Sequence, residues 1–381
     1  MKIVADANIP FVQAAFSQFG ELMTLNTHEI NHTAVKNADM ILVRSETKVS
    51  ESLLKGSKVR FVGTATIGTD HVDLAYLSRK GIGFANAPGS NANAVAEYVI
   101  AALLFIAERN DFVLNGKTMG VVGVGNIGTR VVKMAEALGM QVLLNDPPRA
   151  RITGEVRFLP LDDLMDADIL TLHVPLTRKG QDATFHLFDL NRLNKMKPGS
   201  ILINTARGGV VDTAALKRGL VQNNLAACVL DVWENEPNID MELLTLTAIG
   251  TPHIAGYSLD GKVNATNMIY QKACRYFNLP ITWNANAPSL APELAKIHIT
   301  YDNMCAETVI RKRVKQCYDI EQDDSKLRAL LSMPQSERAG YFESLRSQYP
   351  LRHEFKHTTV ILSAPDKSLK GSLQALGFKV A

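Results

Sequence analysis

The chain has 381 residues, 46% of them hydrophobic, and this length favours two or three domains over a single core. Its net charge of +3 is spread along the sequence without a sustained basic run, which argues against a nucleic-acid or membrane surface. The cysteines show no metal-ligand spacing, so we expect reduced thiols in a cytoplasmic protein; they are Cys228, Cys274, Cys305 and Cys317.

The first 110 or so residues predict βα alternation. Short apolar runs favour strands at 2–5, 40–44, 60–65 and 83–85, with amphipathic stretches between them, and a long helix is expected at 92–108. Strands that alternate with helices form a parallel sheet. The sequence therefore opens with an α/β domain.

A glycine-rich turn follows a predicted strand at 118–122 and leads into a helical pattern at 129–138. Gly123, Gly125 and Gly128 match G-x-G-x-x-G, with Asn126 and Ile127 inside the motif. The first glycine permits the tight turn, the second admits a pyrophosphate close to the backbone, and the third allows close contact of strand and helix. The helix N-terminus attracts the anion. This context predicts a dinucleotide-binding turn.

Asp146 stands 18 residues after Gly128, at the end of a predicted strand at 141–145. An acid at this distance accepts hydrogen bonds from the adenosine ribose and repels a 2′-phosphate, which favours NAD over NADP. Arg149 and Arg151 follow closely and weaken that preference slightly.

Further strands are expected at 169–174, 201–205 and 227–232, which completes a second doubly wound sheet. Because the glycine turn begins so late, the first sheet must belong to a separate domain, to which a helix at 262–278 returns. We therefore expect an α/β protein with two doubly wound parallel-sheet (Rossmann/flavodoxin-like) domains and a small α+β C-terminal domain. The predicted boundaries are 1–92 with 257–284 for the substrate-binding domain, 93–256 for the NAD-binding domain, and 285–381 for the C-terminal domain. In the last we expect helices at 302–314, 325–331 and 368–376 and a strand at 357–363.

Polar residues follow three apolar segments of the second sheet, where such sheets bind ligands. Arg207 could hold a carboxylate through its two-pronged guanidinium group. Glu236 and His253 could form a pair in which the carboxylate stabilises the protonated imidazole. Oxidation of an alcohol needs such a group, because the hydroxyl proton must leave with the hydride.

The Arg, Glu, His series resembles the D-2-hydroxyacid dehydrogenases over roughly residues 1–280. Other matching stretches are Ala87-Pro88-Gly89, His173-Val174-Pro175 and Met196-Lys197-Pro198-Gly199. The resemblance implies that Arg207 orients the substrate, Glu236 supports His253, and His253 transfers the proton. It also implies a cofactor-binding set of Gly123, Gly125, Asn126, Ile127, Gly128, Asp146, Val174, Thr205, Ala206, Asp231 and Gly256. Some relatives have threonine at position 174, so Val174 would contribute backbone atoms only.

Within that family the chain is similar to the branch that oxidises 4-phospho-D-erythronate in vitamin B6 synthesis. The similarity lies in Val43-Arg44-Ser45, in residues 63–73, in Asp146-Pro147-Pro148 and in residues 253–258. It implies that Ser45, Thr66 and Tyr257 bind a small phosphorylated 2-hydroxy acid and that the C-terminal domain forms a homodimer. Hydroxyls suit a polyhydroxy acid, since each can donate and accept. The phosphate needs a cation, for which Arg44 and Arg346 are candidates.

Two alternatives remain open. The first is another dehydrogenase of this family, acting on phosphoglycerate, glycerate or lactate. The second is an NAD-sensing interaction protein similar to corepressors, which share the Arg, Glu, His series. We expect no metal site, because His28 and His32 have no third ligand nearby in the sequence.

Overall fold

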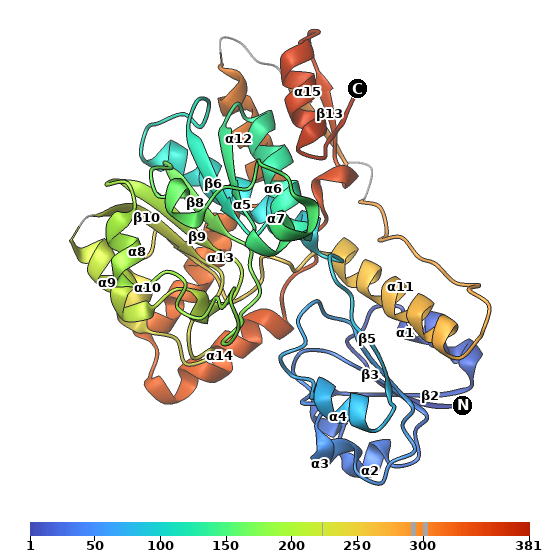
Figure 1. Ribbon diagram of the computed structural model, residues 1–381. Coiled ribbons are helices and arrows are strands. Elements are labelled where there is room, and N and C mark those ends of the chain that lie inside the picture. The colour runs from blue at the N-terminus through green and yellow to red at the C-terminus, as the bar shows by residue number, and fades with distance from the viewer. Residues whose placement is uncertain (223, 291–294, 300–303) are drawn as a thin grey trace. The chain divides into compact units, whose positions relative to one another are not determined.

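The computed structural model describes residues 1–222, 224–290, 295–299 and 304–381 (Figure 1). The chain divides into two compact units. The first comprises Met1–Asn91 and Ser258–Pro288, and the second comprises Ala92–Tyr257 and Ser289–Ala381. The further division of the second unit into a nucleotide-binding domain and a separate C-terminal domain stays a prediction.

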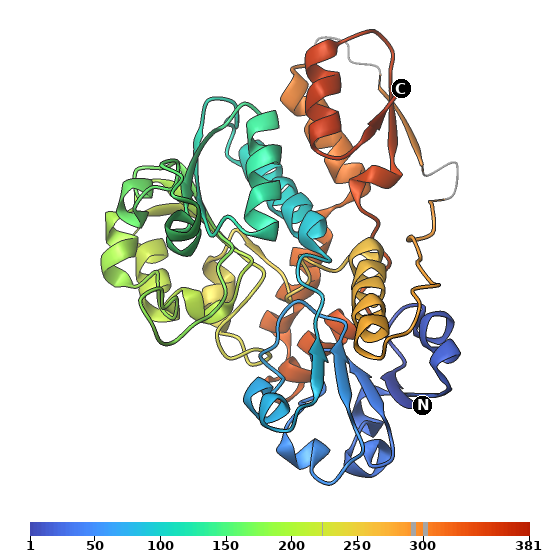
Figure 2. The same cartoon turned by 45° about the vertical axis from the view of Figure 1, so that its right-hand side comes forward.

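The first unit is built on a parallel sheet of order β2-β1-β3-β4-β5. Its helices include the long α11, which lies along the strands of this unit in Figure 2. The strands are β1 (Lys2–Asp6), β2 (Glu21–Leu25), β3 (Met40–Val43), β4 (Phe61–Thr64) and β5 (Gly83–Ala85). The helices are α1 (Val12–Phe16), α2 (His32–Val35), α3 (Glu51–Leu54), α4 (Leu74–Arg79) and α11 (Leu259–Tyr276).

The second unit contains a six-stranded parallel sheet of order β11-β10-β9-β8-β6-β7. Helices cover both of its faces, so β8 and β9 are buried throughout and their sequences are largely apolar. The strands are β6 (Thr118–Val122), β7 (Gln141–Asn145), β8 (Ile169–Leu172), β9 (Ser200–Asn204), β10 (Leu225–Leu230) and β11 (Ile249–Gly250). The helices are α5 (Ala92–Arg109), α6 (Asn126–Ala137), α7 (Pro147–Thr153), α8 (Leu190–Lys195), α9 (Thr213–Val221) and α10 (Met241–Leu246).

The strand order of this sheet reverses beside β6, because β7 lies on one side of it and β8 on the other. Crevices at such switch points, at the carboxyl ends of the strands, are where open α/β sheets bind ligands. The glycine turn follows β6 directly. The fold therefore places the dinucleotide motif where the sequence predicts it.

The C-terminal part of this unit carries a small parallel sheet of order β12-β13-β14. Its strands are β12 (Lys296–Ile299), β13 (Thr359–Leu362) and β14 (Lys379–Val380), and its helices are α12 (Ala306–Cys317), α13 (Ile320–Arg328), α14 (Gln335–Ser347) and α15 (Lys367–Ala375). The helix predicted at 302–314 corresponds to α12, which begins at Ala306. Residues 302 and 303 of that prediction lie outside the described residues. Among the described residues, no helix is both long and apolar enough to cross a membrane.

The predicted α/β class and its two parallel sheets are confirmed, and the strands predicted at 83–85, 118–122 and 141–145 have those bounds. The sequence pattern does not indicate β2 or α14. β2 is an edge strand with several exposed residues, and in α14 Phe342 is the buried residue, so neither shows a clear apolar period.

Candidate active site

The glycine turn has the geometry that its motif predicts. Gly123 has φ +89°, a conformation that favours glycine. A Cβ on Gly128 would lie 2.1 Å from the carbonyl oxygen of Gly123, so helix α6 and the turn approach too closely for any side chain. A Cβ on Gly125 would meet nothing within 4 Å, which leaves open space in front of the N-terminus of α6. Asn126 and Ile127 form the first turn of that helix.

The Asp146 carboxylate is hydrogen-bonded to the backbone of the glycine turn. Its Oδ2 accepts a hydrogen bond of 2.9 Å from the backbone N–H of Val124, and its Oδ1 accepts one of 3.0 Å from that of Arg149. Each carboxylate oxygen has a second lone pair for a further donor. The carboxylate is therefore fixed beside the glycine turn, as a ribose-binding acid requires.

A cavity of about 940 Å³ adjoins these residues. Gly123, Gly125 and Asp146 line one part of it, and Val174 and Thr177 line another. Its size, the open space at Gly125 and the helix N-terminus together fit a dinucleotide. The residues present thus suit NAD.

His173 also lines this cavity, and the sequence reading gave it no role beyond a matching stretch. Its Nε2 lies 3.0 Å from Oγ1 of Thr171, and its Nδ1 lies 3.3 Å from Oγ1 of Thr205. Desolvation lowers the pKa of His173 to about 3, so the ring is neutral at physiological pH. The sequence signal for a site residue was the position of His173 directly after the predicted strand that forms β8. The buried Thr205, predicted to contact the cofactor, contacts this ring in the structure.

Arg207 follows β9, and its backbone is fixed by Asn204. The Asn204 side chain accepts a hydrogen bond from the N–H of Ala206 at 3.0 Å and donates one to the carbonyl of Arg207 at 3.0 Å. Nη1 of Arg207 donates to the Ala206 carbonyl at 2.7 Å. A Cβ on the next residue, Gly208, would lie 2.0 Å from the Trp233 carbonyl, so this segment runs directly beside the one that follows β10.

The side chains of Glu236 and His253 are in direct contact. Nδ1 of His253 lies 2.8 Å from Oε2 of Glu236, and Oε1 of Glu236 accepts a 2.8 Å hydrogen bond from the N–H of Trp233. Burial disfavours the charged carboxylate, but the His253 charge, these hydrogen bonds and the Arg346 charge outweigh it, and the pKa of Glu236 is lowered. The ionised carboxylate can only accept, so Nδ1 carries the hydrogen and Nε2 has the lone pair of a base. The structure thus brings together the two residues that the sequence pairs, and their catalytic roles stay predictions.

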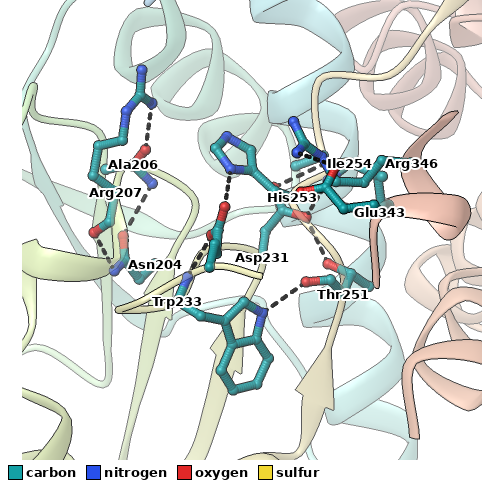
Figure 3. A network of polar contacts seen from close by, with 12 residues as sticks. Asn204, Ala206, Arg207, Asp231, Trp233, Thr251, His253, Ile254, Glu343 and Arg346 are labelled. Carbon is teal, nitrogen blue, oxygen red and sulfur yellow. Dashed lines mark hydrogen bonds and ion pairs between the residues drawn. The ribbon is translucent and has the colours of Figure 1, made fainter. Parts of the chain in front are cut away.

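The loop of His253, residues 251–257, is held in place by hydrogen bonds to Asp231. The buried Asp231 carboxylate accepts hydrogen bonds from Thr251 Oγ1 at 2.7 Å and from the N–H groups of Ile254 and Ala255 at 2.7 and 3.0 Å. His253 has φ 59°, an uncommon conformation for a side-chain residue, which these bonds enforce. Figure 3 shows Asp231 and Thr251 beneath this loop, with His253 between Arg207 and Arg346 in that view. The predicted NAD contacts of Asp231 and Gly256 stay predictions.

The predicted substrate residues lie in both units. Tyr257 ends the loop of His253 in the second unit. In the first unit, Ser45 is exposed just after β3, and Thr66 follows β4 with its hydroxyl 2.8 Å from that of Thr64 and 3.0 Å from the Gly68 carbonyl. Ser45 and Thr66 therefore each follow the carboxyl end of a strand, where α/β sheets bind ligands.

Comparisons with known proteins define the class. Residues 105–255 match the family model of the D-isomer specific 2-hydroxyacid dehydrogenase NAD-binding domain, and residues 290–377 match a domain of unknown function (DUF3410). The structure is similar to a D-lactate dehydrogenase of Aquifex aeolicus complexed with NAD and lactic acid, with 29% identity over 73% of this chain and 96% of that one and a TM-score of 0.61. It is similar too to the TT0316 protein of Thermus thermophilus, with 28% identity, coverage of 73% and 98%, and a TM-score of 0.65. The chain thus carries the NAD-binding domain of an oxidoreductase.

A sequence relative narrows the class. The chain is 44% identical to the erythronate-4-phosphate dehydrogenase of Chromohalobacter salexigens over 100% of this chain and 99% of the relative. It belongs to the erythronate-4-phosphate dehydrogenase family of the D-isomer specific 2-hydroxyacid dehydrogenases. The family resemblance found in the sequence is confirmed.

Proposed function

We propose that this protein oxidises 4-phospho-D-erythronate to (R)-3-hydroxy-2-oxo-4-phosphooxybutanoate with NAD, a step of vitamin B6 synthesis. The observation that carries the proposal is the 2.8 Å contact of Glu236 with His253 in a chain related over its full length to erythronate-4-phosphate dehydrogenases. The phosphate distinguishes this substrate from lactate and glycerate, and its fourth carbon and additional hydroxyl distinguish it from phosphoglycerate.

The proton transfer follows from the tautomer of His253. Bound NAD would supply nicotinamide C4 as the acceptor of the hydride from C2 of the substrate. Nε2 of His253 takes the proton of the 2-hydroxyl as the C–H bond breaks and the C=O bond forms. Glu236 stabilises the imidazolium that results, because its carboxylate faces Nδ1 at 2.8 Å. Products are the 2-oxo acid, NADH and one proton that His253 releases to water.

Arg207 is proposed to hold the substrate carboxylate and the reacting oxygen. Its backbone is fixed by Asn204 and by close contact with the Trp233 segment, which also orients Glu236. A guanidinium group binds a carboxylate through two parallel hydrogen bonds, so it orients as well as attracts the substrate. Ser45, Thr66 and Tyr257 are proposed to bind the substrate hydroxyls and phosphate.

We assign the charge that neutralises the phosphate to Arg44 and Lys262 of the first unit. Arg44 directly follows β3, and Lys262 lies in the N-terminal part of α11, four residues before Thr266, whose hydroxyl donates to the Pro10 carbonyl beyond β1. Both cations therefore belong to the carboxyl-terminal edge of the sheet. Burial and then the charge of Arg44 lower the pKa of Lys262, and a phosphate dianion would relieve that repulsion.

We also propose a cytoplasmic homodimer. The four cysteines are free thiols, which suits a reducing compartment. The C-terminal segment is the proposed dimer contact, on the family resemblance alone. Light scattering of the purified protein tests this state, and a monomeric mass would contradict it.

The function is tested by absorbance in the NADH band with 4-phosphoerythronate, 3-phosphoglycerate and lactate in parallel. Selective turnover of 4-phosphoerythronate is expected. Turnover of another acid alone would assign the chain that activity, and NADH binding without turnover of any acid would support the sensing protein.

A further inference from the structure

The C-terminal segment is built onto the loop of His253. Asp324, on α13, accepts a 2.7 Å hydrogen bond from the N–H of Gly250, three residues before His253. Arg352, buried, donates to the Ala255 carbonyl at 2.7 Å, two residues after it. Tyr349 contacts the ring of Tyr257 edge to face, with centroids 5.8 Å apart. The segment that matches the family model of a domain of unknown function thus supports both ends of this loop.

One cation of this segment lies near the Glu236–His253 pair. Arg346, near the end of α14, has a side chain only 12% exposed. It forms a hydrogen bond with the side chain of Tyr257 and interacts electrostatically with Glu236. Its Nη1 lies 3.8 Å from Oε2 of Glu343, one turn earlier on the same helix. In Figure 3, Arg346 and Glu343 stand beside His253.

Two carboxylates already oppose the charge of Arg346. Glu236 and Glu343 both interact with its guanidinium group. A group that must bind a phosphate dianion is better left without such competitors, because they cancel the attraction. This argues against Arg346 as the phosphate ligand and for a role through its neighbours.

We propose that Arg346 is a positioning residue of the active site, whose guanidinium group holds the hydroxyl of Tyr257 in the orientation that substrate binding needs and whose charge acts on Glu236 during proton transfer. The role deepens the proposed function and rests on it. It gives the segment of unknown function a part in catalysis, since a residue about 110 positions beyond Glu236 completes the surroundings of that carboxylate.

The charge of Arg346 should also affect the pH at which the Glu236–His253 pair takes up a proton. Among the described residues, the charged and titratable groups around this site include Glu236, His253, Asp231, Tyr257, Arg207, Glu343 and Arg346. Among them Arg346 favours the ionised form of Glu236 and so helps to lower its pKa. Its removal should therefore move protonation of the Glu236–His253 pair, and with it the acid limb of the oxidation rate, to higher pH.

The test compares Arg346→Met and Arg346→Lys with Arg338→Met as the control. Arg338 lies on the same helix and donates to the Met333 carbonyl at 3.0 Å. For Arg346→Met we expect kcat/KM for 4-phosphoerythronate to fall roughly 10- to 100-fold, the loss typical of misplaced reacting groups. The acid limb should move to higher pH, while NADH affinity stays unchanged. Arg346→Lys keeps the positive charge, so the acid limb of its pH profile should stay in place. Its KM should rise, because an ammonium group lacks the planar, two-pronged geometry of the guanidinium group.

A wild-type kcat, KM and pH profile in Arg346→Met would overturn the proposal, and so would an equal loss in Arg338→Met. A second readout, an NMR titration of the His253 ring with NADH bound, needs no turnover. We expect the titration of the pair to move to higher pH in Arg346→Met and to stay in place in Arg346→Lys. Failure of the wild-type protein to oxidise 4-phosphoerythronate would sink the proposed function instead, and this titration would still decide whether Arg346 acts on the pair.

Discussion

Nδ1 of His253 lies 2.8 Å from Oε2 of Glu236, a contact made by residues 17 positions apart in the sequence. The Trp233 N–H orients the carboxylate and Asp231 orients the loop of the histidine. The pair is thus fixed from both sides, and Nε2 is the ring nitrogen available as a base.

Removal of the base should abolish most turnover without loss of cofactor. His253→Asn should reduce kcat roughly 10²- to 10⁴-fold, the range for loss of a general base, and Glu236→Gln should reduce it roughly 10²-fold. The control is Glu234→Gln, which removes the charge from a similar 2.8 Å carboxylate–histidine contact with His186. NADH fluorescence should report unchanged affinity in all three. A fully active His253→Asn protein would remove the proposed mechanism.

Two glycines of the same turn should respond oppositely to alanine. Gly125→Ala meets nothing within 4 Å and has no positive φ, so stability should change by no more than about 0.5 kcal/mol while NAD affinity falls. Gly128→Ala would place a Cβ 2.1 Å from a carbonyl oxygen and should destabilise the fold by about 2–3 kcal/mol. Denaturant unfolding and NADH titration measure the two effects. Equal NAD affinity of Gly125→Ala and wild type would show that the open space is not the cofactor site.

Asp146 should decide the choice between NAD and NADP. Asp146→Asn keeps an oxygen that can accept from the Val124 or Arg149 N–H but removes the charge that repels a 2′-phosphate. We expect KM for NAD to rise about tenfold, as for the loss of one charged hydrogen bond, and relative activity with NADP to increase. Glu136→Gln, near the opposite end of α6, is the control. An unchanged ratio of NADP to NAD activity contradicts the assignment.

Phosphate recognition should depend on Lys262 and Arg44. Lys262→Met and Arg44→Met should each raise KM for 4-phosphoerythronate about tenfold, with little change in kcat, because a charge-assisted contact is lost. Lys80→Met, at the opposite edge of the same sheet, should have no effect.

The lowered pKa of Lys262 adds a pH signature. A lysine with a lowered pKa loses its charge earlier as pH rises, so KM of the wild type should increase on the alkaline side. Lys262→Met should lack that increase. If KM is the same in wild type and in both variants, the phosphate binds elsewhere.

Much of the fold was predictable because its signals are local. Strands β6 and β7 are apolar runs bounded by glycine or polar residues, and the glycine turn between β6 and α6 has a steric reason for each glycine. Arg207, Glu236 and His253 could be named because each follows a buried segment of the second sheet. Asp146 was proposed as the ribose-binding acid from its distance to the turn.

Only the tertiary structure showed what surrounds these residues. The polar helix α14 has little apolar period, and nothing near Arg346 in the sequence indicates Glu236 or Tyr257 as its neighbours. His173 likewise acquired its contact with Thr205 through the pairing of β8 with β9. Asp231 acquired its contacts with the residues that follow β11 through the pairing of β10 with β11. The physical reason is that backbone conformation and burial patterns are set by neighbouring residues, whereas hydrogen bonds and charge pairs across a hundred positions exist only once the chain has packed.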